Sequence, residues 1–400
     1  MRKEVPVSVT GMGCVCAAGF CLEVCLETLA SGKRGPADPT RFTNDHGRSY
    51  PVFEIPQKFF MCEGMSDESK SLTFRFALHA TWQALWQARL NATHLGKARV
   101  GVCLGTSVGA SLNFLDFYRE HRAHTTPDLT PIHRYLTSNP ALALAQKLGA
   151  TGPVQTIVNA CSSGADAIGM GAAWIRQGLC DVVIAGGADE LSEVTYNGFI
   201  RLMIADQNAC KPFDANRKGL NLGEGAGIVI LESPAFMSKH KACEHATICG
   251  YGTAADAHHL TAPHPEGLGL KKAIAEALQQ AGLGTRDIAF INAHGTGTLN
   301  NDRAEAAVFK ELFLGKPIVA TKGVTGHTLG AAGAIEAVFT IAHLAAGKIP
   351  ASPGFERPDP ELGVAPTSRP KTIRGKVAMS QSLAFGGNNS VLIIRKGRDV

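Results

Sequence analysis

The sequence contains little charge, few aromatic residues and few prolines. Charged residues account for 18% of the 400 residues and aromatic residues for 6%, and there are 20 prolines. With 45% apolar residues, this composition excludes a disordered tail, and the 44 glycines follow no collagen period. The net charge is only +5, without a run of like charges along which a nucleic-acid backbone could bind, so we expect no nucleic-acid partner. The composition is typical of a compact, enzyme-like chain.

The sequence also lacks a Cys-X-X-Cys pair. Its 11 cysteines are scattered between Cys14 and Cys249, a pattern that predicts neither a disulfide framework nor a zinc cluster. We therefore expect no metal site, and we expect most of the cysteines to be small buried residues. Free thiols are typical of a reducing compartment, which predicts a cytoplasmic protein.

No segment has the pattern of a secretion signal or of a membrane span. Arg2 and Lys3 precede an apolar run, but Glu4 interrupts the positive start that a secretion signal needs. Residues 329–346 form a long apolar stretch that contains Glu336. The charged side chain and several small residues favour a buried core helix there over a membrane span.

Short apolar runs rich in β-branched residues alternate with helix-length segments, which predicts an α/β protein with buried strands. The expected strands are 7–11, 99–104, 154–160, 181–186, 227–231, 247–252, 287–293, 317–321, 376–382 and 390–395. Expected helices include 141–148, the glycine- and alanine-rich 163–177, 268–281 and 329–346. The same alternation of expected strands and helices begins again after about residue 240. We therefore predict two similar halves, 1–240 and 241–400, packed as one body.

Cys161 stands where an expected strand meets an expected helix. It follows the strand 154–160 and precedes Ser162-Ser163-Gly164. Unpaired backbone N–H groups and the helix dipole at such a turn favour the thiolate, which predicts a nucleophile. The alternative is a buried structural cysteine, which is the commoner use of the residue.

Two histidines occupy the same kind of position. His294 closes the expected strand 287–293 and begins a glycine-rich turn, and His327 lies at the start of the alanine-rich helix. Because open α/β sheets bind ligands at the carboxyl ends of their strands, we expect both histidines to converge with Cys161. The alternative is that each is an ordinary hydrogen-bonded polar residue.

Several strings resemble the elongating β-ketoacyl-acyl-carrier-protein synthases, in order and over nearly the whole chain. They are Ala160-Cys161-Ser162-Ser163-Gly164, Pro212-Phe213-Asp214, Gly223-Glu224-Gly225-Ala226-Gly227, His294-Gly295-Thr296-Gly297-Thr298, the run from Lys322 through Gly326-His327 to Gly333, and Phe385-Gly386-Gly387. This resemblance implies the thiolase fold, in which two similar βαβαβαββ halves form a five-layered α-β-α-β-α sandwich, usually as a dimer. The first half would carry the nucleophile and the second half the two histidines.

The resemblance implies a decarboxylative Claisen condensation. An acyl group moves from the phosphopantetheine arm of acyl carrier protein to Cys161, and malonyl carrier then supplies two carbons to give a 3-oxoacyl carrier. His294 and His327 would handle the malonyl group, with Lys322 behind them and Glu336 as its charged neighbour. No bound cofactor is expected, because the carrier brings the arm.

Further roles follow from the same resemblance. The backbone N–H groups of Cys161 and Phe385 would bind the oxyanion, and Phe385 would also be the gate of the pocket. Thr296 and Thr298 would bind pantetheine, with ordinary turn chemistry as the alternative. Val108 would border the acyl pocket, with a core valine as the alternative.

The gate departs from the family pattern, because Ala384 stands where a glycine is usual. Alanine resists backbone angles that glycine allows, so we expect a stiffer or differently opening gate. A specialised polyene or aryl polyene ketosynthase, paired with a chain-length partner that lacks the cysteine, therefore stays an alternative to the fatty acid enzyme.

Two further alternatives are less favoured. A thiolase acting on free coenzyme A thioesters would have a second cysteine near the C-terminus, whereas the last cysteine here is Cys249. A non-catalytic chain-length subunit would generally lack the nucleophile at position 161. For docking of the acidic carrier, the expected cations are Lys58, Lys70, Arg119, Arg122 and Arg201.

Overall fold

The computed structural model describes residues 6–43, 46–61, 65–108, 113–240 and 242–398. Every expected strand is present in one 10-stranded sheet. The strands are β1 (Val7–Cys16), β2 (Val100–Gly105), β3 (Val154–Ile157), β4 (Val182–Asp189), β5 (Gly225–Glu232), β6 (Ala246–Ala255), β7 (Ile288–Asn292), β8 (Ile318–Val319), β11 (Val377–Ala384) and β12 (Asn388–Lys396). A separate pair, β9 (Lys348–Ile349) with β10 (Lys371–Thr372), is too short to show a sequence period.

The sheet repeats one strand pattern twice. Its order is β3-β2-β4-β5-β1 followed by β6-β12-β11-β7-β8, so the second series is the mirror order of the first. In each series the fifth strand, β5 or β12, is antiparallel to both neighbours, and the remaining pairs are parallel. The two series join where β1 pairs with β6. The boundaries 1–240 and 241–400 themselves stay a prediction.

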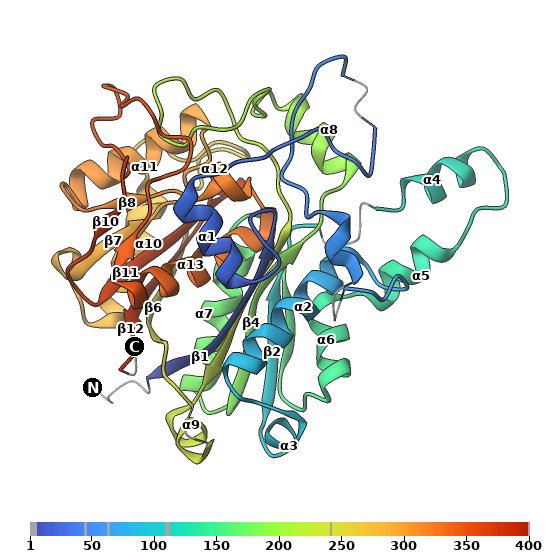
Figure 1. Cartoon of the computed structure of the whole chain (residues 1–400), viewed down its shortest axis with the longest axis horizontal. Helices are drawn as coiled ribbons and strands as arrows, with labels where there is room; N and C mark the ends of the chain where they lie inside the picture. The colour runs from blue at the N-terminus through green and yellow to red at the C-terminus, as the bar shows by residue number, and fades with distance from the viewer. Residues whose placement is uncertain (1–5, 44–45, 62–64, 109–112, 241, 399–400) are drawn as a thin grey trace.

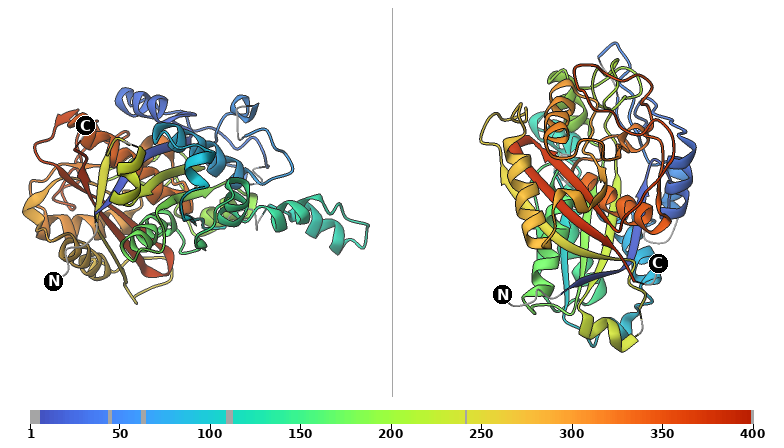
Figure 2. Two further views of the ribbon diagram at one scale, coloured as in Figure 1. Left: turned by 90° about the horizontal axis from the view of Figure 1, so that it is seen from below. Right: turned by 90° about the vertical axis from the view of Figure 1, so that its left-hand side faces the viewer.

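The helices form three layers around the two series of strands (Figures 1 and 2). α2 (Leu72–Gln87) and α6 (Pro140–Leu148) cover the outer side of the first series, and α10 (Leu268–Ala281) and α11 (Leu299–Leu312) cover that of the second. α7 (Ser163–Arg176) and α13 (Ala332–Ala346) lie in the middle and contact strands of both series. This arrangement confirms the expected five-layered sandwich.

The apolar stretch before residue 346 is a core helix, as expected. Leu329–Ala346 is long and apolar enough to cross a membrane, but 83% of it is buried inside the protein. The expectation of one continuous α-helix is wrong at its start, because Leu329–Ala331 forms the 3-10 turn η3 and Leu329 has a φ of 53°. That angle is left-handed and incompatible with an α-helix.

The remaining elements are short or peripheral. They are α1 (Leu22–Ser31), α3 (Ala92–Leu95), α4 (Leu115–Arg122), α5 (Thr130–Thr137), α8 (Glu193–Arg201), α9 (Pro234–His240), α12 (Lys322–Thr325), η1 (Gln57–Met61), η2 (Thr285–Asp287) and η4 (Phe385–Gly387). The helices α4 and α5 form an arm that projects from the body (Figure 2), and neither contains a buried residue.

Glycines allow the middle layer to pack closely, as the composition of α7 predicts. A Cβ atom at Gly169 would lie 2.3 Å from the ring of Tyr251 on β6. One at Gly164 would lie 2.8 Å from the carbonyl oxygen of Gly330. The two halves therefore approach each other at distances that only glycine permits.

We predict that Gly169→Ala destabilises the fold by about 1–3 kcal/mol, because the added methyl group overlaps the rigid ring of Tyr251. Urea unfolding followed by circular dichroism measures the change. Gly198→Ala on α8 is the matched control: a Cβ there meets no atom within 4 Å, and helix propensity predicts a gain of about 0.5–1 kcal/mol. Equal unfolding free energies for the two variants would contradict the close packing.

Candidate active site

Cys161 lies in a tight turn between β3 and α7. The expected strand 154–160 is shorter than predicted, because β3 ends at Ile157 and the chain then turns. Ala160 has a left-handed φ of 48°, which is uncommon for a residue with a Cβ. The hydroxyl of Ser163 donates to the carbonyl oxygen of Ala160 at 2.6 Å and accepts from the N–H of Asn159 at 2.8 Å. Hydrogen bonds within the turn thus hold Cys161 ahead of the helix.

The structure brings most of the predicted site residues together around one cavity. The cavity has a volume of about 240 Å³ and is lined by Cys161, His294, His327 and Phe385. Thr296 and Thr298 line the same space, and their hydroxyl oxygens lie 2.9 Å apart. Residues from both halves of the chain therefore share this space, as the strand-end argument predicts.

The two imidazole rings lie edge to face. Their centroids are 5.2 Å apart and their planes make an angle of 84°. His294 follows β7, and its backbone N–H donates to Glu305 at 2.7 Å. His327 does not follow a strand directly, in contrast to the expectation, because α12 lies between β8 and this residue. Its backbone N–H donates instead to the carbonyl oxygen of Asn221 at 2.8 Å.

The hydrogen bonds of the rings indicate their tautomers. The Nδ1 atom of His327 accepts from the backbone N–H of Leu329 at 3.1 Å. The Nδ1 atom of His294 lies 3.2 Å from Nζ of Lys322, a group that only donates. Burial and the charge of Lys322 lower the pKa of both histidines well below the usual value, so both rings are neutral. Each ring therefore carries its proton on Nε2 and can donate from that atom.

Lys322 and Glu336 form a buried ion pair behind His294. Nζ of Lys322 donates to the carbonyl oxygen of His294 at 2.6 Å and to a carboxylate oxygen of Glu336. Burial raises the pKa of Glu336 to about 7, although Lys322 acts in the opposite direction. The ammonium group is thus tied to both the backbone and the ring of His294, which fixes the position of that histidine.

The pKa of the Cys161 thiol is higher than the sequence predicts. Burial raises its pKa to about 12, and the charge of Lys322 and the backbone N–H of Phe385 act against this rise. The expectation that the turn favours the thiolate is therefore wrong for this state of the protein, because loss of water outweighs the helix terminus. The backbone N–H groups of Phe385 and of Cys161 itself both lower the pKa of this thiol. Their role as the oxyanion hole stays a prediction.

The gate region contains no strain at the alanine. Ala384 has an extended backbone with φ −134° and ψ 155°, and the left-handed angles fall on Gly386 and Gly387. The ring of Phe385 stacks on Phe199 of α8, with centroids 5.5 Å apart. Phe199 was not predicted, because a single aromatic residue in a helix belongs to no motif. The effect of Ala384 on gate opening stays a prediction.

Val108 does not line the cavity of Cys161. It borders a second hollow of about 350 Å³, together with Tyr135, Leu136 and Val158. Residues 109–112, which follow Val108, lie outside the described residues. Its role at the acyl pocket therefore stays a prediction.

The predicted docking cations differ in their surroundings. Arg201 ends α8, beside the cavity residues Phe199 and Met203. Exposed Lys218 also lines the cavity and was not predicted, because one surface lysine carries no sequence signal.

The other predicted cations have partners within the chain. Arg119 is paired with Asp116 and Glu193. The remaining contacts are Arg122 with the Tyr118 hydroxyl, Lys58 with the Phe59 ring and Lys70 with the carbonyl oxygen of Thr137.

Comparisons with known proteins agree with this geometry. Residues 4–235 match the family described as "Beta-ketoacyl synthase, N-terminal domain", and residues 245–356 match "Beta-ketoacyl synthase, C-terminal domain". A 3-oxoacyl-acyl-carrier-protein synthase 2 of Staphylococcus aureus is 31% identical, with 99% of each chain covered. The enzyme of the same name from Synechocystis sp. is 33% identical, with 98% of each chain covered.

Solved structures show the same similarity. The ishigamide ketosynthase/chain length factor superposes with a TM-score of 0.91 at 29% identity, covering 98% of this chain and 100% of that chain. A ketosynthase in complex with its chain length factor from Xenorhabdus doucetiae gives a TM-score of 0.83 at 30% identity, covering 98% of each chain. Because the two family matches account for most of the chain and the relatives align over nearly all of it, the chain belongs to the β-ketoacyl synthase family, with the thiolase fold.

Proposed function

We propose that this protein is an elongating condensing enzyme that joins malonyl-acyl carrier protein to an acyl group held on Cys161. The product is a 3-oxoacyl-acyl carrier protein. The observation that carries the proposal is the meeting of one thiol and two neutral Nε2–H imidazoles around a single cavity. The names of the relatives support it, since they are 3-oxoacyl-acyl-carrier-protein synthases.

The first step is acyl transfer. Sγ of Cys161 attacks the thioester carbonyl carbon, a new carbon–sulfur bond forms, and the carrier thiol leaves with the proton. The backbone N–H groups of Cys161 and Phe385 stabilise the oxyanion of the intermediate. One thioester replaces another, so this step changes the free energy little.

The second step is decarboxylation and carbon–carbon bond formation. The thioester oxygen of malonyl carrier accepts from Nε2–H of His294 and of His327, and loss of carbon dioxide leaves an enolate that these donors stabilise. The enolate carbon attacks the acyl carbonyl on Cys161, and the carbon–sulfur bond breaks. The thiolate left on Cys161 takes a proton from solvent when the product leaves. Apolar walls that include Phe199 and Leu383 exclude water, which would protonate the enolate.

The carrier brings the phosphopantetheine arm, so the enzyme needs no resident cofactor. Thr296 and Thr298 line the cavity, where their hydroxyls suit the amide groups of the arm. Lys218 lines the cavity and Arg201 ends α8, the helix that contributes Phe199 to it. Both cations suit the phosphate of the arm and an acidic carrier. A type II polyketide ketosynthase solved with its acyl-carrier protein, at 25% identity, supports a partner of this kind. We place the reaction in the cytoplasm.

Fatty acid elongation and specialised polyene elongation use the same chemistry. The synthases from Staphylococcus aureus and Synechocystis sp. favour the fatty acid pathway, and the ishigamide ketosynthase supports the specialised one. Mass spectrometry of the acyl group loaded on Cys161 distinguishes them. Equal turnover of free coenzyme A and carrier-bound esters would favour the thiolase alternative instead.

We predict that Cys161→Ala abolishes acylation, lowering condensation by roughly 10³-fold or more, because the attacking sulfur is gone. Intact-protein mass spectrometry after incubation with acyl carrier protein measures the loading. The histidine donors are retained, so decarboxylation of malonyl carrier persists. Cys243→Ala, at an exposed cysteine, is the matched control and loads normally. Acylation of another residue in the Cys161→Ala variant would refute the assignment.

The raised pKa of Cys161 predicts an unusual pH dependence of alkylation. With a thiol pKa of about 12, the thiolate fraction and the rate of reaction with iodoacetamide rise about tenfold per pH unit up to about pH 10. An ordinary thiol, with a pKa of about 8.5, levels off near pH 9 instead. Peptide mapping of the alkylated protein assigns the rate to Cys161. A plateau at or below about pH 8 would mean that the helix terminus outweighs burial.

A second thiolase-fold chain is the partner that best covers the exposed edge of the sheet. β3 is the terminal strand of the sheet on that side. Large apolar side chains on and around it are exposed: Tyr135, Leu136, Leu142, Val154 and Val158. Free strand edges and apolar patches of this kind pair with other chains. The partner is a second copy of this chain or a chain-length partner, which the titles of two similar structures name for those proteins.

We predict that Val158→Lys weakens this pairing at least tenfold, because it buries a charge in the interface. Light scattering during gel filtration measures the mass. A dimer of the chain expressed alone indicates a homodimer, and a monomer that dimerises only with a chain-length partner indicates a heterodimer. Leu314→Lys, at an exposed leucine elsewhere, leaves the pairing intact. An unchanged dimer in Val158→Lys would contradict this surface.

A further inference from the structure

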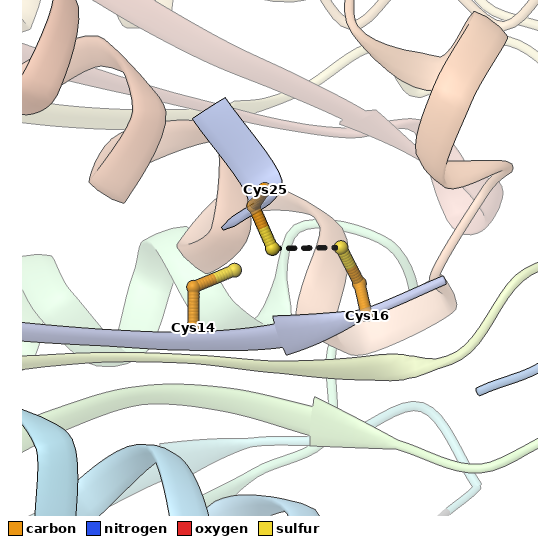
Figure 3. A group of neighbouring side chains, drawn as sticks. All are labelled: Cys14, Cys16 and Cys25. Carbon is orange, nitrogen blue, oxygen red and sulfur yellow. Dashed lines mark hydrogen bonds between the residues drawn. The ribbon is translucent and has the colours of Figure 1, made fainter. Parts of the chain in front are cut away.

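Three cysteine side chains meet in the core between β1 and α1. Cys14 and Cys16 rise from β1, and Cys25 points down from α1 toward them (Figure 3). Their sulfur atoms all lie within 4.8 Å of one another, and those of Cys16 and Cys25 are 3.7 Å apart. All three residues are completely buried. None of them lines the cavity of Cys161.

The local structure explains why the thiols converge. Cys14 and Cys16 are two residues apart on a strand, so their side chains project from the same face. Paired backbone hydrogen bonds between Cys16 and Gly19, both 3.0 Å long, form a tight turn that returns the chain over this face. The helix α1 then buries Leu22, Cys25 and Leu29, which lie on one side of it. The sequence spacing predicts no metal site, because the three cysteines do not form a Cys-X-X-Cys motif. It is the turn that places the thiol of Cys25 next to the other two.

The sulfur positions suit a single metal ion. A metal–sulfur bond of about 2.3 Å in a trigonal plane places the sulfur atoms about 4.0 Å apart. The sulfur atoms of Cys16 and Cys25 are 3.7 Å apart, and all three lie within 4.8 Å of one another, so small shifts of the side chains complete the site. Thiolates select soft ions such as Cu(I) and Zn(II), and structural zinc takes four ligands. The group found among the described residues offers three.

We propose that Cys14, Cys16 and Cys25 form a binding site for one thiophilic d¹⁰ metal ion, with Cu(I) as the ion that three sulfur donors suit best. A hollow between α1 and α2 lies next to this site, separated from the three thiols by core residues that pack against them. This hollow has a volume of about 360 Å³ and is lined by Met12, Cys21 and Leu22. Cys21 is partly exposed, so its thiol can receive the ion from solvent. The bound ion joins β1 to α1 and stabilises their contact.

Anaerobic titration of the reduced, metal-free chain with Cu(I), in competition with a chromophoric chelator, tests the site. We expect one tightly bound ion per chain, and X-ray absorption of that complex shows three sulfur neighbours at about 2.3 Å. Cys25→Ala and Cys14→Ala each weaken this binding at least a hundredfold. Titration with Zn(II) distinguishes the ions: binding of Zn(II) in preference to Cu(I) would overturn the trigonal assignment.

The other thiols provide the controls. Cys161→Ala and Cys243→Ala keep the tight site, since neither residue belongs to the group. Condensation activity and circular dichroism show whether Cys25→Ala folds. If the Cys25→Ala variant does not fold, the number of sulfur neighbours that X-ray absorption finds in the Cu(I) complex of the unaltered protein tests the site. Equal Cu(I) affinity in the original chain and a folded Cys25→Ala variant, or fewer than three sulfur neighbours, would mean that these thiols act only as small core residues.

Discussion

The chemistry depends on the interactions of one buried ammonium group, that of Lys322, with Glu336 and His294. Lys322 and Glu336 are almost completely inaccessible to water, and removal of one partner from such a pair costs about 3–5 kcal/mol. The same ammonium group donates toward Nδ1 of His294 and to its carbonyl oxygen. After burial itself, its charge is the next cause of the low pKa of His294 and of His327. Burial and this one cation together keep both rings neutral, and the cation directs the proton of His294 to Nε2.

The middle layer of helices connects this chemistry to the fold. α7 belongs to the first half, and Cys161 lies in the turn just before it. η3 and α13 belong to the second half and follow His327. Polar contacts cross the same boundary: Tyr251 donates to Asp166 at 2.9 Å, and the N–H of Gly330 donates to Asp189 at 2.6 Å. Because the helices pack through glycines, the two halves hold the thiol and the imidazoles at fixed separations. Relative motion of the halves would separate the reacting groups.

The sequence predicts the parts of this structure that depend on local pattern. Strand positions follow from short β-branched runs, and Cys161 and His294 could be placed because each ends such a run. Properties that depend on surroundings could not be predicted. The pKa of Cys161 is set by burial from both halves, Phe199 acts through a stacking contact, and the three-cysteine group depends on a turn at Gly19. None of these has a sequence period or a motif.

Burial of Cys161 has opposite consequences for the two half-reactions. It raises the pKa of the thiol, which slows attack on the first thioester, and it excludes the water that would destroy the enolate in the second step. An exposed thiol would gain in acylation and lose in condensation. The backbone N–H of Phe385 offsets part of the first penalty, because it lowers the pKa of this thiol. Phe385 also lines the cavity, so the gate that the resemblance implies at this residue would couple thiol reactivity to access through one backbone group.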